Sequence, residues 1–213
     1  MILYRPIDGG VQQTKIEYHP KTCFVMTQLG TPIPKEVEKI RIKFRAILSK
    51  YGMEEIDAGS EITGRDFLLK IWRMIISVPL GIGIIDDNMS SNTLCNIFYE
   101  LGLMHALGKE TIVIKTEKAR VPSDFVRTEY IKFDDKFEEN LKKYFTTYFN
   151  LADYYETFAD QLERNPLLAI DYLRRAYLIS GNKKLRVKAK KLHREAILED
   201  RAKNSVEQLL VDF

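Results

Sequence analysis

The sequence predicts an α/β fold, a five-stranded parallel sheet with flanking helices, followed by a C-terminal helical extension. Short apolar runs alternate with segments in which apolar residues recur every three or four positions, as strands alternate with amphipathic helices. This alternation favours parallel strands joined by right-handed crossovers. After about residue 150 the strand-like runs stop, and helical periodicity alone continues through the 213-residue chain.

Five strand-like runs can be placed between residues 21 and 150. They are residues 23–27, 53–56, 82–85, 111–114 and 130–133. Helical spacing fills the intervals, with apolar positions that begin near Val37, Phe67, Leu94 and Phe137. The expected arrangement is a flavodoxin-like sheet with strand order 2-1-3-4-5. In such a sheet, ligands bind beyond the carboxyl ends of the strands, at the switch between strands 1 and 3.

The two ends of the chain are expected to lie outside the α/β domain of residues 21–150. Residues 1–20 form an N-terminal extension, in which residues 11–18 have the weak alternation of an edge strand or hairpin arm. Residues 151–213 form a C-terminal α-helical domain. Its predicted helices cover 151–162, 167–179 and, as one helix or two, 183–210. A helical hairpin cannot bury both of its faces alone, so we favour a homo-oligomer assembled through these helices.

The composition is that of an ordinary soluble globular protein, with 45% hydrophobic and 30% charged residues. The net charge of +3 is too small to predict nucleic-acid binding. Cys23 and Cys95 fall in predicted core elements and are expected to be buried free thiols, as in a reducing cytoplasm. No zinc-binding spacing occurs, so no metal is expected. Neither the G-x-G-x-x-G nor the G-x-x-x-x-G-K-[ST] motif occurs, and no bound cofactor is expected. The longest apolar stretch is too short and too interrupted to span a membrane.

Lysine and arginine are concentrated near the C-terminus, with seven of them between residues 183 and 194. A solvated helix face is the simpler interpretation of such a run. The alternative is a surface for an anionic partner such as a nucleotide or RNA, whose binding would weaken with salt.

Residues 82–108 form the most informative segment, because they predict a strand, an acidic loop and a helix in succession. Asp86 and Asp87 end the strand. Any of residues 91–93 can cap the following helix, which is expected to cover residues 94–107. The free N–H groups at its start would favour a phosphate.

Glu100 lies within this helix, beside a stripe of apolar residues. The stripe consists of Ile97, Leu101 and Met104, and Glu100 shares the adjacent face with Asn96 and Leu103. A carboxylate next to a core-facing stripe is costly to bury unless it is paired. At the ligand-binding end of a parallel sheet it is a candidate site residue. The alternative is a surface glutamate with a solvated head.

The sequence around Glu100 resembles a known family signature. Residues 96–109 read NIFYELGLMHALGK, which is similar to the N-V-x-Y-E-L-G-x-A-H-A-L-G-K motif of bacterial TIR-like nucleotide-binding proteins, relatives of the nucleoside 2-deoxyribosyltransferases. Residues 22–26 and 84–86 resemble the first and third strands of these families. The resemblance covers roughly residues 21–145. It implies a TIR-like domain whose motif glutamate, Glu100, is the catalytic residue at a sugar anomeric carbon.

The resemblance implies an N-glycosidase that cleaves NAD as its substrate. Glu100 would stabilise or attack the oxocarbenium-like carbon as nicotinamide departs. The resemblance also implies a bacterial antiphage-defence effector activated by self-assembly. One alternative is a nucleoside or nucleotide deoxyribosyltransferase or N-glycosidase, although residues 90–96 lack the glycine and second aspartate usual in the transferases. The other alternative is a non-enzymatic nucleotide sensor.

The remaining expected site residues follow strands 1 to 3 or lie on the helix of Glu100. Gly30 would permit a close backbone approach, and the aspartates could hydrogen bond to a ribose hydroxyl or base edge. The asparagines could orient the sugar, while turns and caps are the alternative roles for these polar residues. The expected substrate-binding residues are Thr27, Gln28, Gly30, Asp57, Asp86, Asp87, Asn92 and Asn96.

Overall fold

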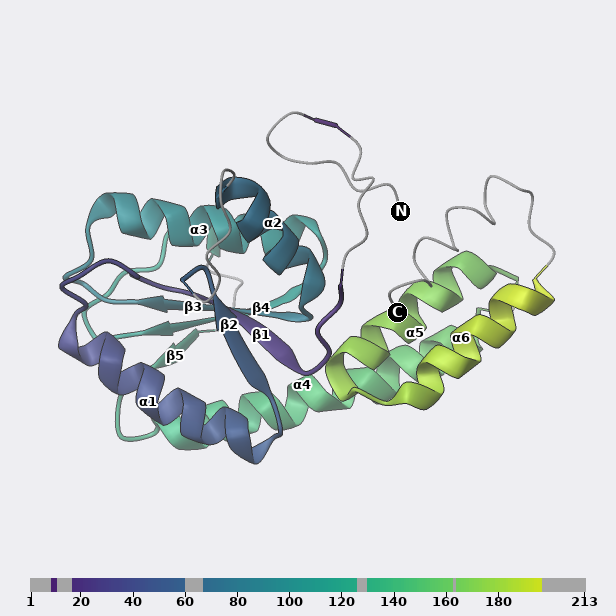
Figure 1. Ribbon diagram of the computed structural model, residues 1–213. Coiled ribbons are helices and arrows are strands. Elements are labelled where there is room, and N and C mark those ends of the chain that lie inside the picture. The colour runs from purple at the N-terminus through teal and green to yellow at the C-terminus, as the bar shows by residue number, and fades with distance from the viewer. Residues whose placement is uncertain (1–8, 11–16, 60–66, 126–129, 163, 197–213) are drawn as a thin grey trace. The chain divides into compact units, whose positions relative to one another are not determined.

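The chain forms two compact units in the computed structural model, which describes residues 9–10, 17–59, 67–125, 130–162 and 164–196. One unit is Thr22–Tyr144, and the other combines Met1–Lys21 with Phe145–Phe213. Both are drawn in Figure 1. The helix α4 (Phe137–Asp160) belongs to both units. The sequence predicted two helices over this stretch, and that prediction is wrong.

A five-stranded sheet forms the centre of the first unit. Its strands are β1 (Thr22–Met26), β2 (Glu54–Asp57), β3 (Leu80–Ile85), β4 (Glu110–Lys115) and β5 (Tyr130–Lys132). The order is β2-β1-β3-β4-β5, and every neighbouring pair is parallel. The predicted fold class and strand order are therefore confirmed. β1 and β3 are buried along their whole length, as their continuous apolar sequences require.

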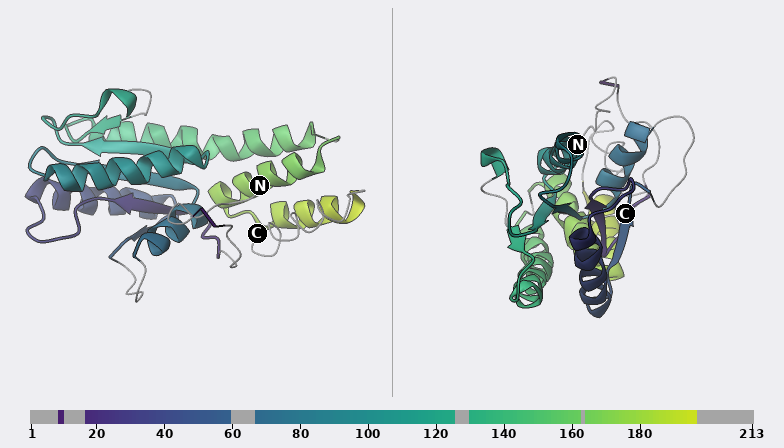
Figure 2. Two further views of the ribbon diagram at one scale, coloured as in Figure 1. Left: turned by 90° about the horizontal axis from the view of Figure 1, so that it is seen from above. Right: turned by 90° about the vertical axis from the view of Figure 1, so that its left-hand side faces the viewer.

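Helices cover both faces of this sheet. They are α1 (Lys35–Lys50), α2 (Phe67–Ser77), α3 (Ser91–Ala106) and the part of α4 up to Tyr144, with the short 3₁₀ helix η1 (Ser123–Phe125) between β4 and β5. Figures 1 and 2 show α2 and α3 on one face and α1 on the other. This division follows from right-handed crossovers, because the chain moves one way along the sheet from β1 to β2 and the other way from β2 onwards.

Two glycines of β3 allow α3 to approach the sheet closely. A Cβ atom at Gly83 would lie 2.9 Å from Leu101 Cδ1, and one at Gly81 would lie 2.9 Å from Met104 Cε. Leu101 and Met104 are fully buried, which confirms the apolar stripe predicted beside Glu100. The glycines therefore fix the height of α3, and of every side chain on it, above β3.

The turn after α3 also holds the end of α2. Gly108 takes the left-handed conformation with φ 63°. The ammonium group of Lys109 then donates hydrogen bonds to the carbonyl oxygens of Ile76 (2.8 Å) and Val78 (2.7 Å). A cation at these carbonyls complements the negative end of the α2 dipole. Two residues of the family-like motif thus have a structural role.

The second unit contains the part of α4 from Phe145 onwards, α5 (Pro166–Ser180) and α6 (Lys183–Glu195). Apolar residues from these helices form its core, including Ala159, Leu173, Ala176, Leu185 and Ala189. The predicted continuation of α6 beyond residue 196 lies outside the described residues, as does most of the predicted edge strand of residues 11–18.

Residues 17–21 attach the N-terminal segment to the helices of this same unit. Arg174 of α5 donates a hydrogen bond to the Tyr18 hydroxyl at 2.8 Å, and the Lys21 N–H donates to the Leu178 carbonyl at 2.7 Å. The segment therefore packs as part of the helical unit.

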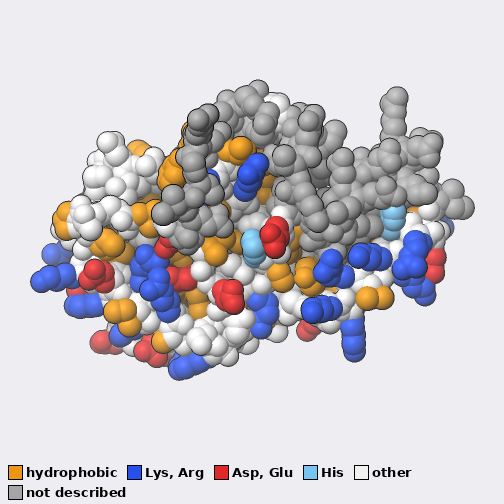
Figure 3. All heavy atoms as spheres, viewed as in Figure 1, with side chains coloured by type: hydrophobic (Ala, Val, Ile, Leu, Met, Phe, Trp, Pro, Cys, Tyr) orange, Lys and Arg blue, Asp and Glu red, His pale blue; other side chains and the backbone are white. Residues whose placement is uncertain are grey.

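Basic side chains gather along the outer face of α6 (Figure 3). Leu185, Ala189 and Leu192 pack inward, and the exposed cations are Lys183, Lys184, Lys190, Lys191 and Arg194. Lys188 differs, since its ammonium pairs with Glu156 and Asp160 of α4.

Among the helices that the structure describes, none combines the length and hydrophobicity needed to cross a membrane.

Candidate functional site

The turn from β3 into α3 is built by side chains that satisfy the backbone. Asp86, only 1% exposed, accepts hydrogen bonds from the Asn88 N–H and side-chain amide, both at 2.9 Å. Ser90 caps α3 by accepting from the Thr93 N–H at 3.2 Å. The prediction of a cap among residues 91–93 is thus wrong, since those residues already lie within the helix.

The direction of Glu100 follows from the contacts on the other flank of α3. Phe98 and His105 pack on Phe125 of η1, with ring centroids 5.0 and 5.6 Å apart, so this flank faces η1. Glu100 comes two residues after Phe98, roughly half a helical turn away. It therefore projects from the flank toward β1 and α2, both of which contact α3. This is the switch between strands 1 and 3.

Glu100 carries a partly buried carboxyl group. Within the described part of the chain, no side chain forms an ion pair or a hydrogen bond with it. Burial raises its pKa from 4.5 to about 7. A carboxyl group of this kind exists in both protonation states near neutral pH, so it can act as a base, a nucleophile or an acid.

Asn92 and Asn96 lie on the ridge of α3 that leads to Glu100. The three residues follow one another at spacings of four, which places them on one side of the helix. Both asparagines are exposed, while Glu100 is partly covered. Their amides are therefore available to a ligand at the carboxyl edge of the sheet.

Two polar side chains join neighbouring strands at this edge. Thr27 donates a hydrogen bond to the Ile84 carbonyl at 3.2 Å, which ties the end of β1 to β3. Thr116, immediately after β4, donates to the carboxylate of the exposed Asp87 at 3.3 Å. Thr116 was not among the predicted site residues, and only the register of β3 against β4 brings it to Asp87.

Gln28 and Gly30 belong to the loop that follows β1. The side-chain amide of Gln28 donates to the carbonyl oxygens of Gly30 (3.2 Å) and Pro32 (2.8 Å). Gln28 therefore shapes this loop, while Gly30 is exposed and leaves space around its backbone.

Asp57 lies apart from the other predicted site residues. Asp57 lies opposite Val25 in the β1–β2 ladder, and the side chain of Val25 points to the other face of the sheet from that of Met26. The Asp57 carboxylate binds Arg41 of α1 at 2.6 Å. Arg41 also contacts Glu55 at 3.1 Å. Asp57 thus belongs to an ion-pair cluster on the α1 face, whereas Glu100 lies on the α3 face. The structure does not bring these two carboxylates together.

The arrangement favours reactions that need one carboxyl group and several hydrogen-bonding groups. Among the described residues, no group of three or more histidine, cysteine, aspartate or glutamate side chains could hold a metal ion.

Cys95, on α3, is exposed and free, so the prediction that it is buried is wrong. Cys23 is buried and free, as predicted, and its burial raises the pKa of the thiol.

Comparison with known proteins gives structural matches alone. No family model and no curated protein matches the sequence. A 2-deoxyribosyltransferase from Bacillus psychrosaccharolyticus is 16% identical, with a TM-score of 0.42, over 56% of this chain and 89% of its own. A CMP N-glycosidase from Clostridium botulinum is 22% identical, with a TM-score of 0.42, over 58% of this chain and 98% of its own. At these values the likeness concerns the fold alone, and the TIR-like assignment stays a prediction.

Proposed function

We propose that the protein is an N-glycosidase that cleaves NAD, with Glu100 as its catalytic carboxylate. The observation that carries this proposal is a partly buried carboxyl group, directed toward the switch between β1 and β3, that has no counter-charge among the residues the structure describes. Ligands of open parallel sheets bind at this position. The similarity of residues 96–109 to the TIR-like motif supports the same residue.

The chemistry suits a single carboxylate. As the bond between nicotinamide and ribose breaks, the anomeric carbon gains positive charge. Ionised Glu100 would stabilise that charge or attack the carbon to form a covalent intermediate. Nicotinamide departs as a neutral molecule, so no general acid is needed. Asn92, Asn96 and Asp87 are proposed to bind the ribose hydroxyl groups.

The proposal is tested by incubating the purified protein with NAD and measuring released nicotinamide, alongside Glu100→Gln. We expect the substitution to lower kcat at least 100-fold, since Gln keeps the shape and loses the negative charge. Asn96→Ala is expected to have a smaller effect, mainly on KM. Wild-type turnover that persists in the Glu100 variant would exclude this mechanism.

The raised pKa of Glu100 favours a second candidate, a nucleoside or nucleotide N-glycosidase or deoxyribosyltransferase. A purine or pyrimidine leaves more easily when it is protonated, and a carboxyl group with a pKa of about 7 can supply that proton. The dependence of kcat on pH separates the two. With NAD the rate should rise up to about pH 7 and then level, because the ionised form is needed. With a nucleoside that needs the protonated form, the rate should fall above about pH 7.

Self-assembly through the helical unit is part of the proposal. Support comes from apolar side chains exposed on that unit, which include Tyr154 (58%), Leu167 (38%), Leu168 (40%) and Val187 (65%). Light scattering coupled to size exclusion measures the oligomer, and activity assays across protein concentration test whether assembly activates it.

The role in antiphage defence rests on the motif resemblance, and phage challenge of cells expressing wild-type or Glu100→Gln protein tests it. Tight nucleotide binding without turnover in the assembled state would favour the sensor.

A further inference from the structure

Two large apolar side chains at the start of α2 are exposed although their positions in the helix face the sheet. Phe67 is 57% exposed and Leu68 is 55% exposed. Phe67 comes four residues before Ile71 and seven before Met74, and Leu68 comes three before Ile71 and seven before Ile75, so they share a helix face with these residues. Ile71, Met74 and Ile75 are at most 5% exposed. The stripe that forms the core under most of α2 therefore continues, uncovered, through its first turn.

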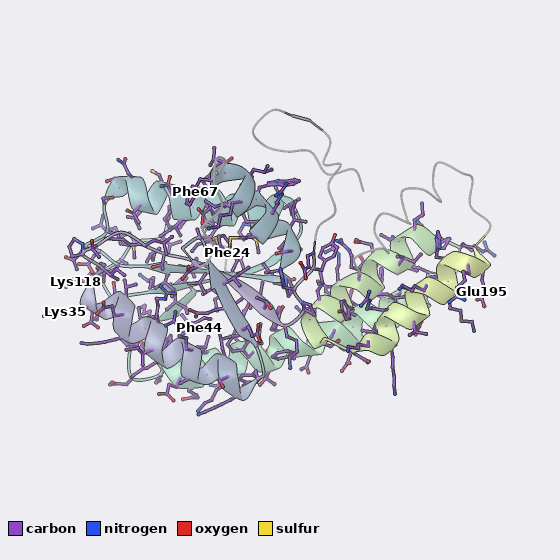
Figure 4. The ribbon with its side chains drawn as sticks, viewed as in Figure 1. Phe24, Lys35, Phe44, Phe67, Lys118 and Glu195 are labelled. Carbon is purple, nitrogen blue, oxygen red and sulfur yellow. The ribbon has the colours of Figure 1, made fainter. Side chains whose placement is uncertain are left out.

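This uncovered end of the stripe lies on the Glu100 side of the sheet. α2 packs directly against α3, and the flank of α3 toward α2 is the one that carries Glu100. Figure 4 labels Phe67 on the same side of the sheet as α3, with Phe24 of β1 nearer the sheet centre. The first turn of α2 and the Glu100 flank of α3 thus border the same part of the switch between β1 and β3.

The chemistry of these neighbours is complementary to the two halves of a nucleotide. The α3 ridge of Asn92, Asn96 and Glu100 presents amides and a carboxyl group, which suit a sugar. Phe67 and Leu68 present an aromatic ring and a branched alkyl group, which suit the flat face of a base. Base–aromatic stacking contributes about 1–3 kcal/mol and accepts any base, because every base has a π face.

We infer that Phe67, supported by Leu68, is the surface on which the base or nicotinamide of the substrate stacks. The inference rests on the proposed function and adds its base-binding residue. It also indicates the substrate class, a ligand that carries a planar aromatic group, since a base-free sugar phosphate would leave this surface unused. The stacked base would further shield Glu100 from water, which strengthens electrostatic interactions at the anomeric carbon.

The test measures binding by calorimetry in the Glu100→Gln protein, which is used so that ligands are not consumed. The probes are NAD, CMP, AMP and ribose 5-phosphate, each titrated into the Gln protein with and without Phe67→Ala. We expect Phe67→Ala to weaken the binding of at least one base-bearing ligand about 5- to 100-fold, and ribose 5-phosphate by less than twofold. Phe67→Tyr keeps the ring and should restore the affinity.

The matched control is Ile42→Ala, which removes a side chain that is 68% exposed on α1, at the opposite face. It should leave every affinity unchanged. Equal affinity of the Phe67→Ala and parent proteins for all base-bearing probes would overturn the inference, as would an equal loss for ribose 5-phosphate. Either result is compatible with Glu100-dependent turnover, so the proposed function would survive.

If no probe binds up to millimolar concentration, both the stacking inference and the proposed function are excluded. If the probes bind and stack but the wild type cleaves none, the inference stands and the enzymatic proposal fails.

Discussion

Glu100 carries its charge at a cost to the stability of the fold. Below pH 4.5 the carboxyl group is protonated in both the folded and unfolded chain and contributes nothing. Between pH 4.5 and about 7 the unfolded chain ionises first, so folding loses stability as the pH rises, and the loss is complete above the folded pKa of about 7. At about 1.4 kcal/mol per pKa unit, the full loss is about 3 kcal/mol.

Glu100→Gln should therefore be more stable than the wild type at pH 8, by up to about 3 kcal/mol, and equally stable at pH 4.5. Urea denaturation followed by circular dichroism at both pH values measures this difference. Glu54→Gln, at an exposed position of β2, is the control for replacing a glutamate. A gain in stability that is the same at both pH values would show that the ionised carboxylate is not the cause.

At the scale of residues, the sequence could predict that Glu100 borders the core stripe, because helical spacing alone fixes which residues share a face. It could not predict that Asp57 pairs with Arg41, since that contact depends on α1 packing against β2. The sequence could not predict the exposure of Phe67 either. Its spacing predicts a core residue, whereas the ring is 57% exposed.

At the scale of elements, two glycines test how α3 is placed. Gly83 lies in β3 beneath the helix, where a Cβ atom would meet the fully buried Leu101 at 2.9 Å. Gly102 lies within α3, where a Cβ atom would meet nothing within 4 Å. The same substitution by alanine should therefore have opposite effects on the free energy of unfolding at these two positions.

Gly83→Ala should destabilise the protein by about 1–3 kcal/mol, because the added methyl group overpacks a filled core. Because the helix must shift to admit the methyl group, kcat should fall as well. Gly102→Ala should stabilise by about 0.5–1 kcal/mol through helix propensity, with activity retained. Denaturation and nicotinamide release measure both variants. Loss of stability in Gly102→Ala, or none in Gly83→Ala, would contradict this account of α3.

The elements differ in how well their ends could be predicted. Strand order followed from the alternation of strands and helices, since crossover handedness leaves few topologies. The predicted end of α5 at residue 179 is within one residue of the observed end at Ser180, and Gly181, which follows, has a φ of 69° that glycine adopts without strain. The unbroken course of α4 through residue 150 was missed although no glycine or proline interrupts it, because the strand-like runs stop there and the pattern suggested a change of domain.

For the molecule as a whole, the division into two units predicts that a local defect stays local. Asp171 of α5 binds Arg174 at 2.6 Å and Arg175 at 3.0 Å. Burial alone would raise the pKa of Asp171, but the two arginines outweigh it and lower that pKa. Arg174 is 6% exposed and also binds Tyr18 of the N-terminal segment. Asp171→Asn leaves the buried guanidinium without its carboxylate, which should cost about 3–5 kcal/mol.

Hydrogen exchange measured by mass spectrometry locates this loss. Asp171→Asn should speed exchange in residues 17–21 and 145–195, because Tyr18 binds α5 through this cluster and α4, α5 and α6 share one apolar core, while exchange in 22–144 stays as in the wild type. Glu139→Gln removes an exposed pair with Lys143 and should change neither region. Faster exchange throughout the sheet unit in Asp171→Asn would mean that the two units unfold together. In that case the helical unit would be an integral part of the α/β fold rather than a module able to assemble independently.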